Sequence, residues 1–388
     1  MIGSVAIVST NNDHAVFRNP VTISHEVQLL LAAARAPRPG QSPPHLSSLL
    51  RDDLNWERVF QLAKMNHVLP LLRHALDQAG WAHVPPEMRT QIKREWTIGT
   101  QRSLLLGSEL LRALQLLERE TIAAAPIKGP SLAEHVYGGV GLRHFNDIDI
   151  LIRRESLWRA RDVLCANGYR PLLSLTSGEE RRYIQRHNDY PLVHATLPVY
   201  IELQWEIVGD VFHFPRYIDG WWDRCVTTAL MTRTVQTLEN EDLLLLLCVH
   251  GCKHLWERLG WVCDVSELLR STPALNWRSV FARARAEGVF RMLLVGLTLA
   301  HTLAGAPVPE PIRELAARDA TVCALVSLSQ TLMFRYEASQ ELVKKHTPLY
   351  YLQMRERFRD KFLIARHFYP SLLQPLQTLR RYRANDTG

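Results

Sequence analysis

The chain has 388 residues, of which 47% are hydrophobic and 22% charged, as is usual for a globular protein and unlike a disordered one. Its net charge of +7 suits anionic ligands but does not require nucleic acid. No window reaches the roughly eighteen apolar residues of a membrane span, and the N-terminus lacks the pattern of a secretion signal. The six cysteines show no disulfide framework, so we expect a cytoplasmic protein.

The first third of the chain has apolar residues at helical spacing. We expect an N-terminal helical region over residues 1–118, although residues 1–24 have no clear periodicity. A loop rich in Pro and Gly near residue 40, and later Gly80, interrupt the pattern. The helices are predicted over residues 26–35, 46–55, 56–75 and 86–118.

Residues 122–137 have the pattern of a strand, a tight turn and a helix. The apolar run ends in Lys128-Gly129-Pro130-Ser131, and a helical pattern follows. Pro130 suits the first helical turn, where a missing N–H costs nothing. A helix that begins after a glycine presents free backbone N–H groups to a phosphate, and Lys128 and the Ser131 hydroxyl are placed to assist. The pattern therefore predicts a phosphate-binding turn.

Two aspartates alternate with isoleucines in the next strand, predicted over residues 145–152. Because side chains alternate faces along a strand, Asp147 and Asp149 point one way while Ile148 and Ile150 point the other. Ionised carboxylates this close repel each other, and a divalent cation between them relieves the repulsion. The alternative is a strand end whose aspartates face water. Asp is depleted in strands, so two in alternation favour the metal site.

A third carboxylate lies in the segment 199–207, where alternation places Glu202 on the face opposite Ile201 and Leu203. With residues 190–195, this segment is predicted to form a hairpin. Beside the Asp pair, Glu202 would complete a three-carboxylate site for two Mg²⁺ ions about 3.5–4 Å apart. The alternative is that Glu202 lies on the solvent face of an edge strand.

The remaining pattern completes an α/β core over residues 119–236 and a C-terminal helical domain over residues 237–388. The C-terminal domain is predicted to be helical as far as Tyr382, with a break at three prolines near residue 309. The core gains three further elements: a helix over 155–167 capped by Gly168, a strand over 169–175 and a helix around 178–186.

The segment 241–259 is strongly helical and carries one polar stripe. His250, Lys253 and His254 stand at i, i+3 and i+4, so they share a face. Lys253 would contact phosphate as a point charge. Two alternatives stay open, namely a purely structural stripe and zinc bound by the two histidines with the nearby cysteines Cys248, Cys252 and Cys263.

The C-terminal stretch is the most basic part of the chain, with aromatic residues interleaved among its cations. A nucleic-acid surface has this composition, and so does a solvated amphipathic helix whose aromatics pack inward, which we favour. The cations are Arg355, Arg357, Arg359, Lys361, Arg366, Arg380, Arg381 and Arg383, and the aromatics are Phe358, Phe362, Phe368, Tyr369 and Tyr382.

The order of these motifs resembles the DNA polymerase β-type nucleotidyltransferase superfamily, and more narrowly a bacterial branch of the NTP_transf_5 type. The resemblance covers roughly residues 120–270, and Gln204 departs from it where a His is expected. It is carried by Lys128-Gly129, Asp147-Ile148-Asp149 and Ile201-Glu202-Leu203, with Arg143, Asn167-Gly168-Tyr169, His187, Pro191-Leu192-Val193-His194 and the segment 250–259 in support.

The resemblance implies an α+β fold, in which a small mixed-sheet core of the polymerase β type is flanked by N-terminal and C-terminal α-helical regions. It also implies Mg²⁺-dependent transfer of a nucleoside monophosphate from an NTP co-substrate, with release of pyrophosphate. The acceptor would be a hydroxyl or phosphate of a small molecule, peptide or protein. Asp147, Asp149 and Glu202 would be catalytic and would hold two Mg²⁺ ions, or Mn²⁺. The nucleotide phosphates would contact Lys128, Gly129, Ser131, Arg143, Lys253, His250 and His254.

Two other functions compete with this one. A related enzyme with a nucleic-acid acceptor has only the basic C-terminal stretch in its support. A nucleotide-binding regulatory protein without turnover would have no need of three clustered carboxylates, so the complete set Asp147, Asp149 and Glu202 argues against it.

Overall fold

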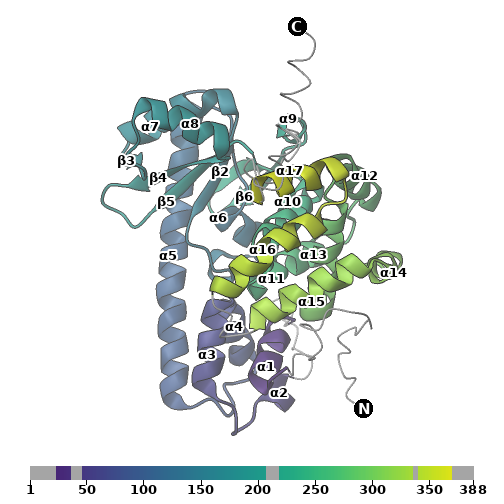
Figure 1. The fold of residues 1–388 in the computed structure, drawn as a ribbon. Coiled ribbons are helices and arrows are strands. Elements are labelled where there is room, and N and C mark those ends of the chain that lie inside the picture. The colour runs from purple at the N-terminus through teal and green to yellow at the C-terminus, as the bar shows by residue number, and fades with distance from the viewer. Residues whose placement is uncertain (1–22, 36–45, 207–217, 335–339, 369–388) are drawn as a thin grey trace.

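The computed structural model describes residues 23–35, 46–206, 218–334 and 340–368. A five-stranded mixed sheet stands beside one long helix, and many shorter helices fill the rest of the molecule (Figure 1). The predicted α+β fold with flanking helices is confirmed.

The five strands lie in the order β1-β2-β5-β4-β3. Strands β2 and β5 pair in parallel, and every other neighbouring pair in this sheet is antiparallel. The predicted Asp-x-Asp strand and the predicted hairpin are therefore present and are direct neighbours. The strands are β1 (Ala124–Pro126), β2 (Ile148–Ile152), β3 (Tyr169–Pro171), β4 (Asp189–His194) and β5 (Tyr200–Gln204).

The two faces of this sheet belong to two different hydrophobic cores. Ile148, Ile150 and Ile152 are fully buried in a core that includes residues of α5 (Pro86–Arg119) and α7 (Leu157–Ala166). Leu151 points to the other face and joins the larger core formed by the helices. The alternation seen in the sequence thus reflects a sheet covered on both faces.

Helices α3 (Trp56–Met65) and α4 (Leu69–Gln78) replace the single predicted helix over residues 56–75. The break falls at His67, whose φ of 58° is left-handed. Pro70 follows in the first turn of α4, where it needs no N–H partner, whereas in a helix continuing from α3 it would remove a hydrogen bond and clash. Helix α2 (Leu46–Leu49) is also shorter than the helix predicted over residues 46–55.

A second, two-stranded sheet was not predicted. Strands β6 (Val226–Leu230) and β7 (Arg233–Thr237) form a hairpin that packs beside β1. The Thr237 hydroxyl donates to the carbonyl of Pro126 over 2.7 Å and fixes this contact. Most of the hairpin's side chains are exposed or half-buried, so its sequence lacks the apolar alternation that marks a strand.

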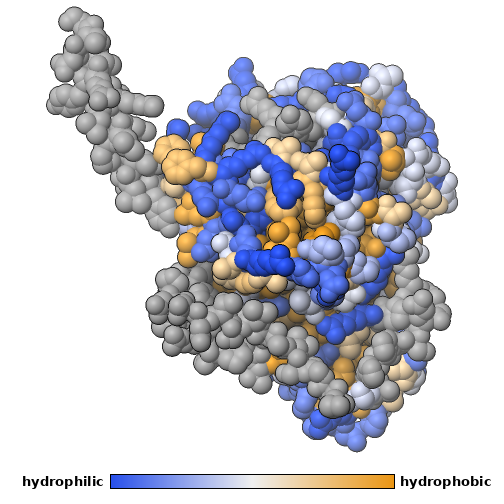
Figure 2. Space-filling view, turned by 90° about the vertical axis from the view of Figure 1, so that its right-hand side faces the viewer, coloured by the Kyte–Doolittle hydropathy of each residue, from blue (hydrophilic) through white to orange (hydrophobic). Residues whose placement is uncertain are grey.

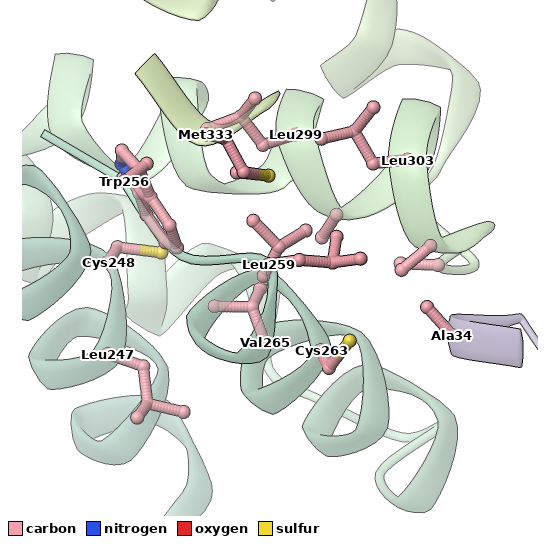
Figure 3. Close-up of a cluster of buried hydrophobic side chains, with 14 of the residues drawn as sticks. Ala34, Leu247, Cys248, Trp256, Leu259, Cys263, Val265, Leu299, Leu303 and Met333 are labelled. Carbon is pink, nitrogen blue, oxygen red and sulfur yellow. The ribbon is translucent and has the colours of Figure 1, made fainter. Parts of the chain in front are cut away.

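The remaining helices build most of the molecule, and none of the helices in the described ranges is long and apolar enough to cross a membrane. Figure 3 shows part of their core, where Trp256, Leu259 and Leu299 lie among other apolar side chains. On the face shown in Figure 2, hydrophilic side chains surround a central group of apolar ones. These helices are α1 (His25–Ala34), α6 (Gly129–Leu132), α8 (Ser177–Arg186), α9 (Ile218–Trp222), α10 (Asn240–Lys253), α11 (Leu259–Ser271), α12 (Trp277–Glu287), α13 (Phe290–Ala304), α14 (Glu310–Arg318), α15 (Ala320–Phe334), α16 (Gln340–Met354) and α17 (Phe358–Phe368).

The basic C-terminal stretch departs from its prediction in two respects. Phe358 is 84% exposed and Phe362 43% exposed, so these aromatics do not pack inward as expected. Arg355 is fully buried and pairs with Asp360 over 2.6 Å, so it is not part of a solvated cationic face. The remainder of the stretch, from Tyr369 to Arg383, lies outside the described residues.

Two glycines in helices give a matched test of this packing. A Cβ at Gly251 in α10 would overlap the buried Trp256 ring, whereas a Cβ at Gly99 in α5 meets no atom within 4 Å. We expect Gly251→Ala to lower the free energy of unfolding by about 1–3 kcal/mol through overpacking. Gly99→Ala should raise it by about 0.5–1 kcal/mol, because alanine favours the helix. Urea unfolding measures both, and equal effects at the two positions would contradict the described packing.

Candidate active site

The parallel pairing of β2 and β5 places Asp149 directly opposite Glu202. Cross-strand partners share a face, so both carboxylates lie on the side of the sheet away from the isoleucines. Asp149 is only 3% exposed, and Glu202 is half-buried. The fold thus brings together, from residues more than fifty positions apart, two of the three carboxylates singled out in the sequence.

Two side chains supply the hydrogen-bond donors that this carboxylate pair needs. The Lys128 ammonium lies 3.1 Å from Asp149 Oδ1. The Gln204 amide donates to Asp149 Oδ1 and, over 3.0 Å, to Glu202 Oε2. Gln204, which departs from the expected histidine, therefore holds the two carboxylates in a fixed relation.

The turn after β1 brings Lys128 to this position. Gly129 has a φ of 58°, and a Cβ there would stand 3.0 Å from the carbonyl oxygen of Asp147. Glycine is required because both the backbone conformation and the close approach exclude a side chain. Asp147 itself comes immediately before β2, not within a strand over 145–152 as predicted.

The carboxylates carry more negative charge than their neighbours neutralise. Burial and the nearby Asp149 raise the pKa of Asp147, although Lys128 and Arg143 oppose the shift. Burial, Asp149 and Asp189 raise the pKa of Glu202 to about 7. Burial alone would lower the pKa of Lys128, but the surrounding carboxylates outweigh it and raise that pKa. Burial and mutual repulsion thus both disfavour the ionised forms of Asp147 and Glu202.

Asp189 is a fourth carboxylate, which the sequence analysis missed. It opens β4 opposite Gln204 in the antiparallel register, so it shares the face that carries Glu202. Tyr183 donates to its carboxylate over 3.3 Å. Extending the predicted hairpin strand by one residue before Tyr190 would have placed Asp189 on this face.

The polar stripe of α10 lies near the carboxylates. Lys253 is close enough for Asp189, Glu202 and Asp149 to raise its pKa, although burial and Lys128 lower it overall. No carboxylate within the described ranges forms an ion pair with this ammonium.

The two histidines of the same stripe contact the ring of Trp261 at the start of α11, His250 edge-on and His254 at a tilt. The ring centroids of His250 and His254 are 4.8 Å apart, and those of His254 and Trp261 are 5.0 Å apart. Burial and neighbouring cations, Lys128 and Lys253 among them, lower the pKa of both histidines, to about 3 for His254. Both imidazoles are therefore neutral at physiological pH.

Arg143 and Ser131 were both predicted to contact phosphate, but the structure gives Arg143 a carboxylate partner and buries Ser131. Arg143 forms a two-pronged ion pair with Asp264 of α11, at 2.7 and 2.8 Å, and Tyr137 donates to the same carboxylate over 2.8 Å. Arg143 thereby ties the loop before Asp147 to α11. Ser131 is buried in α6, and no hydrogen bond within the described residues joins its hydroxyl to the carboxylates.

The cysteines near the histidine stripe are core residues. Cys248 and Cys263 lie among apolar side chains (Figure 3), and burial raises the pKa of both thiols. Cys252 accepts a hydrogen bond from Trp256 in the same core. Within the described ranges, no group of three or more His, Cys, Asp or Glu side chains is arranged to hold a metal ion.

The raised pKa of Glu202 makes stability depend on pH. Its folded pKa of about 7 exceeds the unfolded value of 4.5, so the stability gained from its bound proton is lost as pH rises through 7. In metal-free buffer we expect Glu202→Gln to raise the free energy of unfolding by about 1–2 kcal/mol at pH 8 and to change it little at pH 4, after discounting for partial exposure. Glu314→Gln on exposed α14 is the control. An effect of Glu202→Gln that does not vary with pH would contradict the account.

Comparison with known proteins agrees with this geometry. The model of a family described as uncharacterised nucleotidyltransferases matches residues 52–305, which include the sheet, Lys128, the carboxylates and α10 to α13. None of the curated proteins matches the chain. The chain belongs to this family of nucleotidyltransferases (NTP_transf_5).

Proposed function

We propose that this nucleotidyltransferase is Mg²⁺-dependent and moves a nucleoside monophosphate from an NTP to a hydroxyl or phosphate of a small molecule, peptide or protein, releasing pyrophosphate. The observation that carries the proposal is the pairing of Asp149 with Glu202 across β2 and β5, with Asp147 and Lys128 beside them. Membership of the family supports the transfer of a nucleotidyl group.

The donor set suits Mg²⁺. Hard divalent cations prefer carboxylate oxygens. Burial and neighbouring carboxylates raise the pKa of Asp147 and Glu202, and a bound cation would relieve the repulsion among these carboxylates. Asp147, Asp149 and Glu202 would hold two Mg²⁺ ions, or Mn²⁺. The bound ions would neutralise charge on the phosphate oxygens and polarise the α-phosphate.

The chain's own side chains would bind and orient the substrates. Lys128 contacts Asp149, and Lys253 lies close enough for the carboxylates to affect its pKa. The ammonium groups of both lysines would bind the oxygens of the triphosphate. Gln204 would keep Asp149 and Glu202 oriented. Arg143 would act through its pair with Asp264, which positions the loop before Asp147. The other residues proposed to surround the nucleotide are Gly129, Ser131 and the neutral His250 and His254.

Glu202 has the properties of a general base. Its carboxylate would take the proton of an acceptor hydroxyl, or position the group that does. The acceptor oxygen then forms a bond to the α-phosphorus, and the bond from that phosphorus to the bridging oxygen of the β-phosphate breaks. Pyrophosphate leaves with the bond's electron pair, and the proton stays on Glu202.

A nucleic-acid acceptor has little support in the described part of the basic C-terminal stretch. Arg355 is paired with Asp360, and Arg357 donates to backbone carbonyls of α12, including that of Ala286 over 2.6 Å. These two cations are therefore engaged within the protein.

Carboxylate variants test the proposed function. We expect a saturating NTP to stabilise the wild type only with Mg²⁺ or Mn²⁺, by about 2.7 kcal/mol at a hundred times its Kd. Asp147→Asn, Asp149→Asn and Glu202→Gln should each lose most of this stabilisation and at least about a hundredfold of pyrophosphate release. Thermal unfolding with each NTP measures the first effect and a coupled pyrophosphate assay the second.

The matched control is Asp162→Asn on α7, because Asp162 is 66% exposed and pairs only with its neighbour Arg161 within the described residues. It should bind NTP like the wild type. If no NTP stabilises the wild type with either metal, or if the site variants behave like Asp162→Asn, the proposal is wrong.

A further inference from the structure

A second group of basic side chains plays no part in the proposed reaction. The ring centroids of His67 and His144 are 4.3 Å apart, and Arg258 Nη1 lies 3.2 Å from His67 Nε2. These three residues come from the turn between α3 and α4, the loop before Asp147 and the start of α11. All three are half-buried.

The packing that joins these segments is tight, so the cluster has a defined geometry. The N–H of Gly260 donates to the carbonyl of Asn66 over 2.9 Å, and the N–H of Leu259 donates to the Asn66 side chain over 3.0 Å. A Cβ at Gly260 would stand 3.1 Å from His67 Cβ. The start of α11 is thus fixed against the turn that carries His67.

The cluster is basic and has no acidic member. Burial lowers the pKa of His67 to about 3 and that of His144 to about 4, and the charged groups that add to both shifts are arginines, among them Arg143 and Arg258. Arg102 of α5 stands nearby, where it donates to the carbonyl of Asn146 over 3.3 Å.

Arg258 differs from two other half-buried arginines in the ion pairs that it makes. Arg143 pairs with Asp264, and Arg224 pairs with Asp242. Within the described ranges Arg258 has no carboxylate partner and contacts only His67 and the face of Trp261, 5.3 Å from the ring centroid. These contacts leave the charge of the guanidinium without a counter-charge, so an anionic ligand would complete the site.

We infer that Arg258, His67 and His144 form a subsite for a phosphate-type oxyanion, adjoining the carboxylate site. A guanidinium offers two parallel N–H donors that match two phosphate oxygens, and each neutral imidazole offers one further N–H. Arg143 links this subsite to the carboxylates, because its charge acts on His67 and His144 and also on Asp147. Its role in catalysis rests on the proposed function, whereas its ability to bind an oxyanion does not.

Inorganic phosphate tests the subsite directly. With EDTA present, calorimetric titration should show phosphate binding to the wild type, weakened at least about tenfold in Arg258→Gln and in His67→Asn. Asn is chosen at position 67 because it tolerates the left-handed backbone there. Arg258→Lys keeps the charge but loses the forked geometry, so it should fall between wild type and Arg258→Gln.

Arg318→Gln is the control, because Arg318 is 77% exposed on α14 and pairs only with Glu314 within the described residues. It should bind phosphate like the wild type. Phosphate binding of equal strength in wild type, Arg258→Gln and His67→Asn would overturn the subsite, as would no binding at all to the wild type.

Nucleotide titrations with Mg²⁺ then distinguish two sources of the oxyanion. If the subsite holds the end of the triphosphate, Arg258→Gln weakens ATP binding and leaves AMP binding unchanged. If it holds a phosphate of the acceptor, ATP binding is unchanged, and inorganic phosphate still binds the ATP-saturated wild type in an Arg258-dependent way. Both results support the subsite.

The same titrations separate the subsite from the proposed function. Phosphate binding that depends on Arg258, without Mg²⁺-dependent NTP binding, would support the subsite and contradict the proposed transferase function. NTP binding that depends on Asp149, with phosphate binding that does not depend on Arg258, would support the transferase function and contradict the subsite.

Discussion

The pairing of Asp149 with Glu202 across two parallel strands is the constraint on which the site depends. It places two carboxylates side by side, one almost fully buried, where their repulsion is costly. Lys128 and Gln204 offset part of that cost by donating to the pair. The raised pKa of Glu202 shows that the compensation is incomplete. Under the proposed function, a divalent cation and a triphosphate would offset the remaining cost when they bind.

The rest of the fold keeps this pair in place. One face of the sheet packs on α5 and α7 through its isoleucines, which makes the strands rigid, while the other face carries the polar side chains toward the helices. The buried network of Arg143, Asp264 and Tyr137 ties the loop before Asp147 to α11. In Figure 1, α6 and β6 lie between the sheet and the helices of the C-terminal half. Movement of α11 would therefore reach both the carboxylates and the proposed oxyanion subsite.

Local patterns predicted those parts of the site that depend on local geometry. Alternation placed Asp149 and Glu202 on the polar faces of their strands, and the Gly129 turn followed from its Lys-Gly-Pro sequence. Contacts between distant segments were beyond these patterns. The partner of Arg143 comes from 121 residues away, and that of Arg258 from 191 residues away. The β6–β7 hairpin was not predicted, because its side chains are mostly exposed and its sequence has no apolar alternation.

The central claim is that the Asp149–Glu202 pair binds divalent cations together with a nucleotide. Electron paramagnetic resonance of Mn²⁺ tests it directly, because free and bound Mn²⁺ are counted separately. With a non-hydrolysable NTP analogue, the account predicts about two bound Mn²⁺ ions per chain that compete with Mg²⁺, and loss of at least one in Asp149→Asn. No bound Mn²⁺ in the wild type, or the same number in Asp149→Asn, would contradict it.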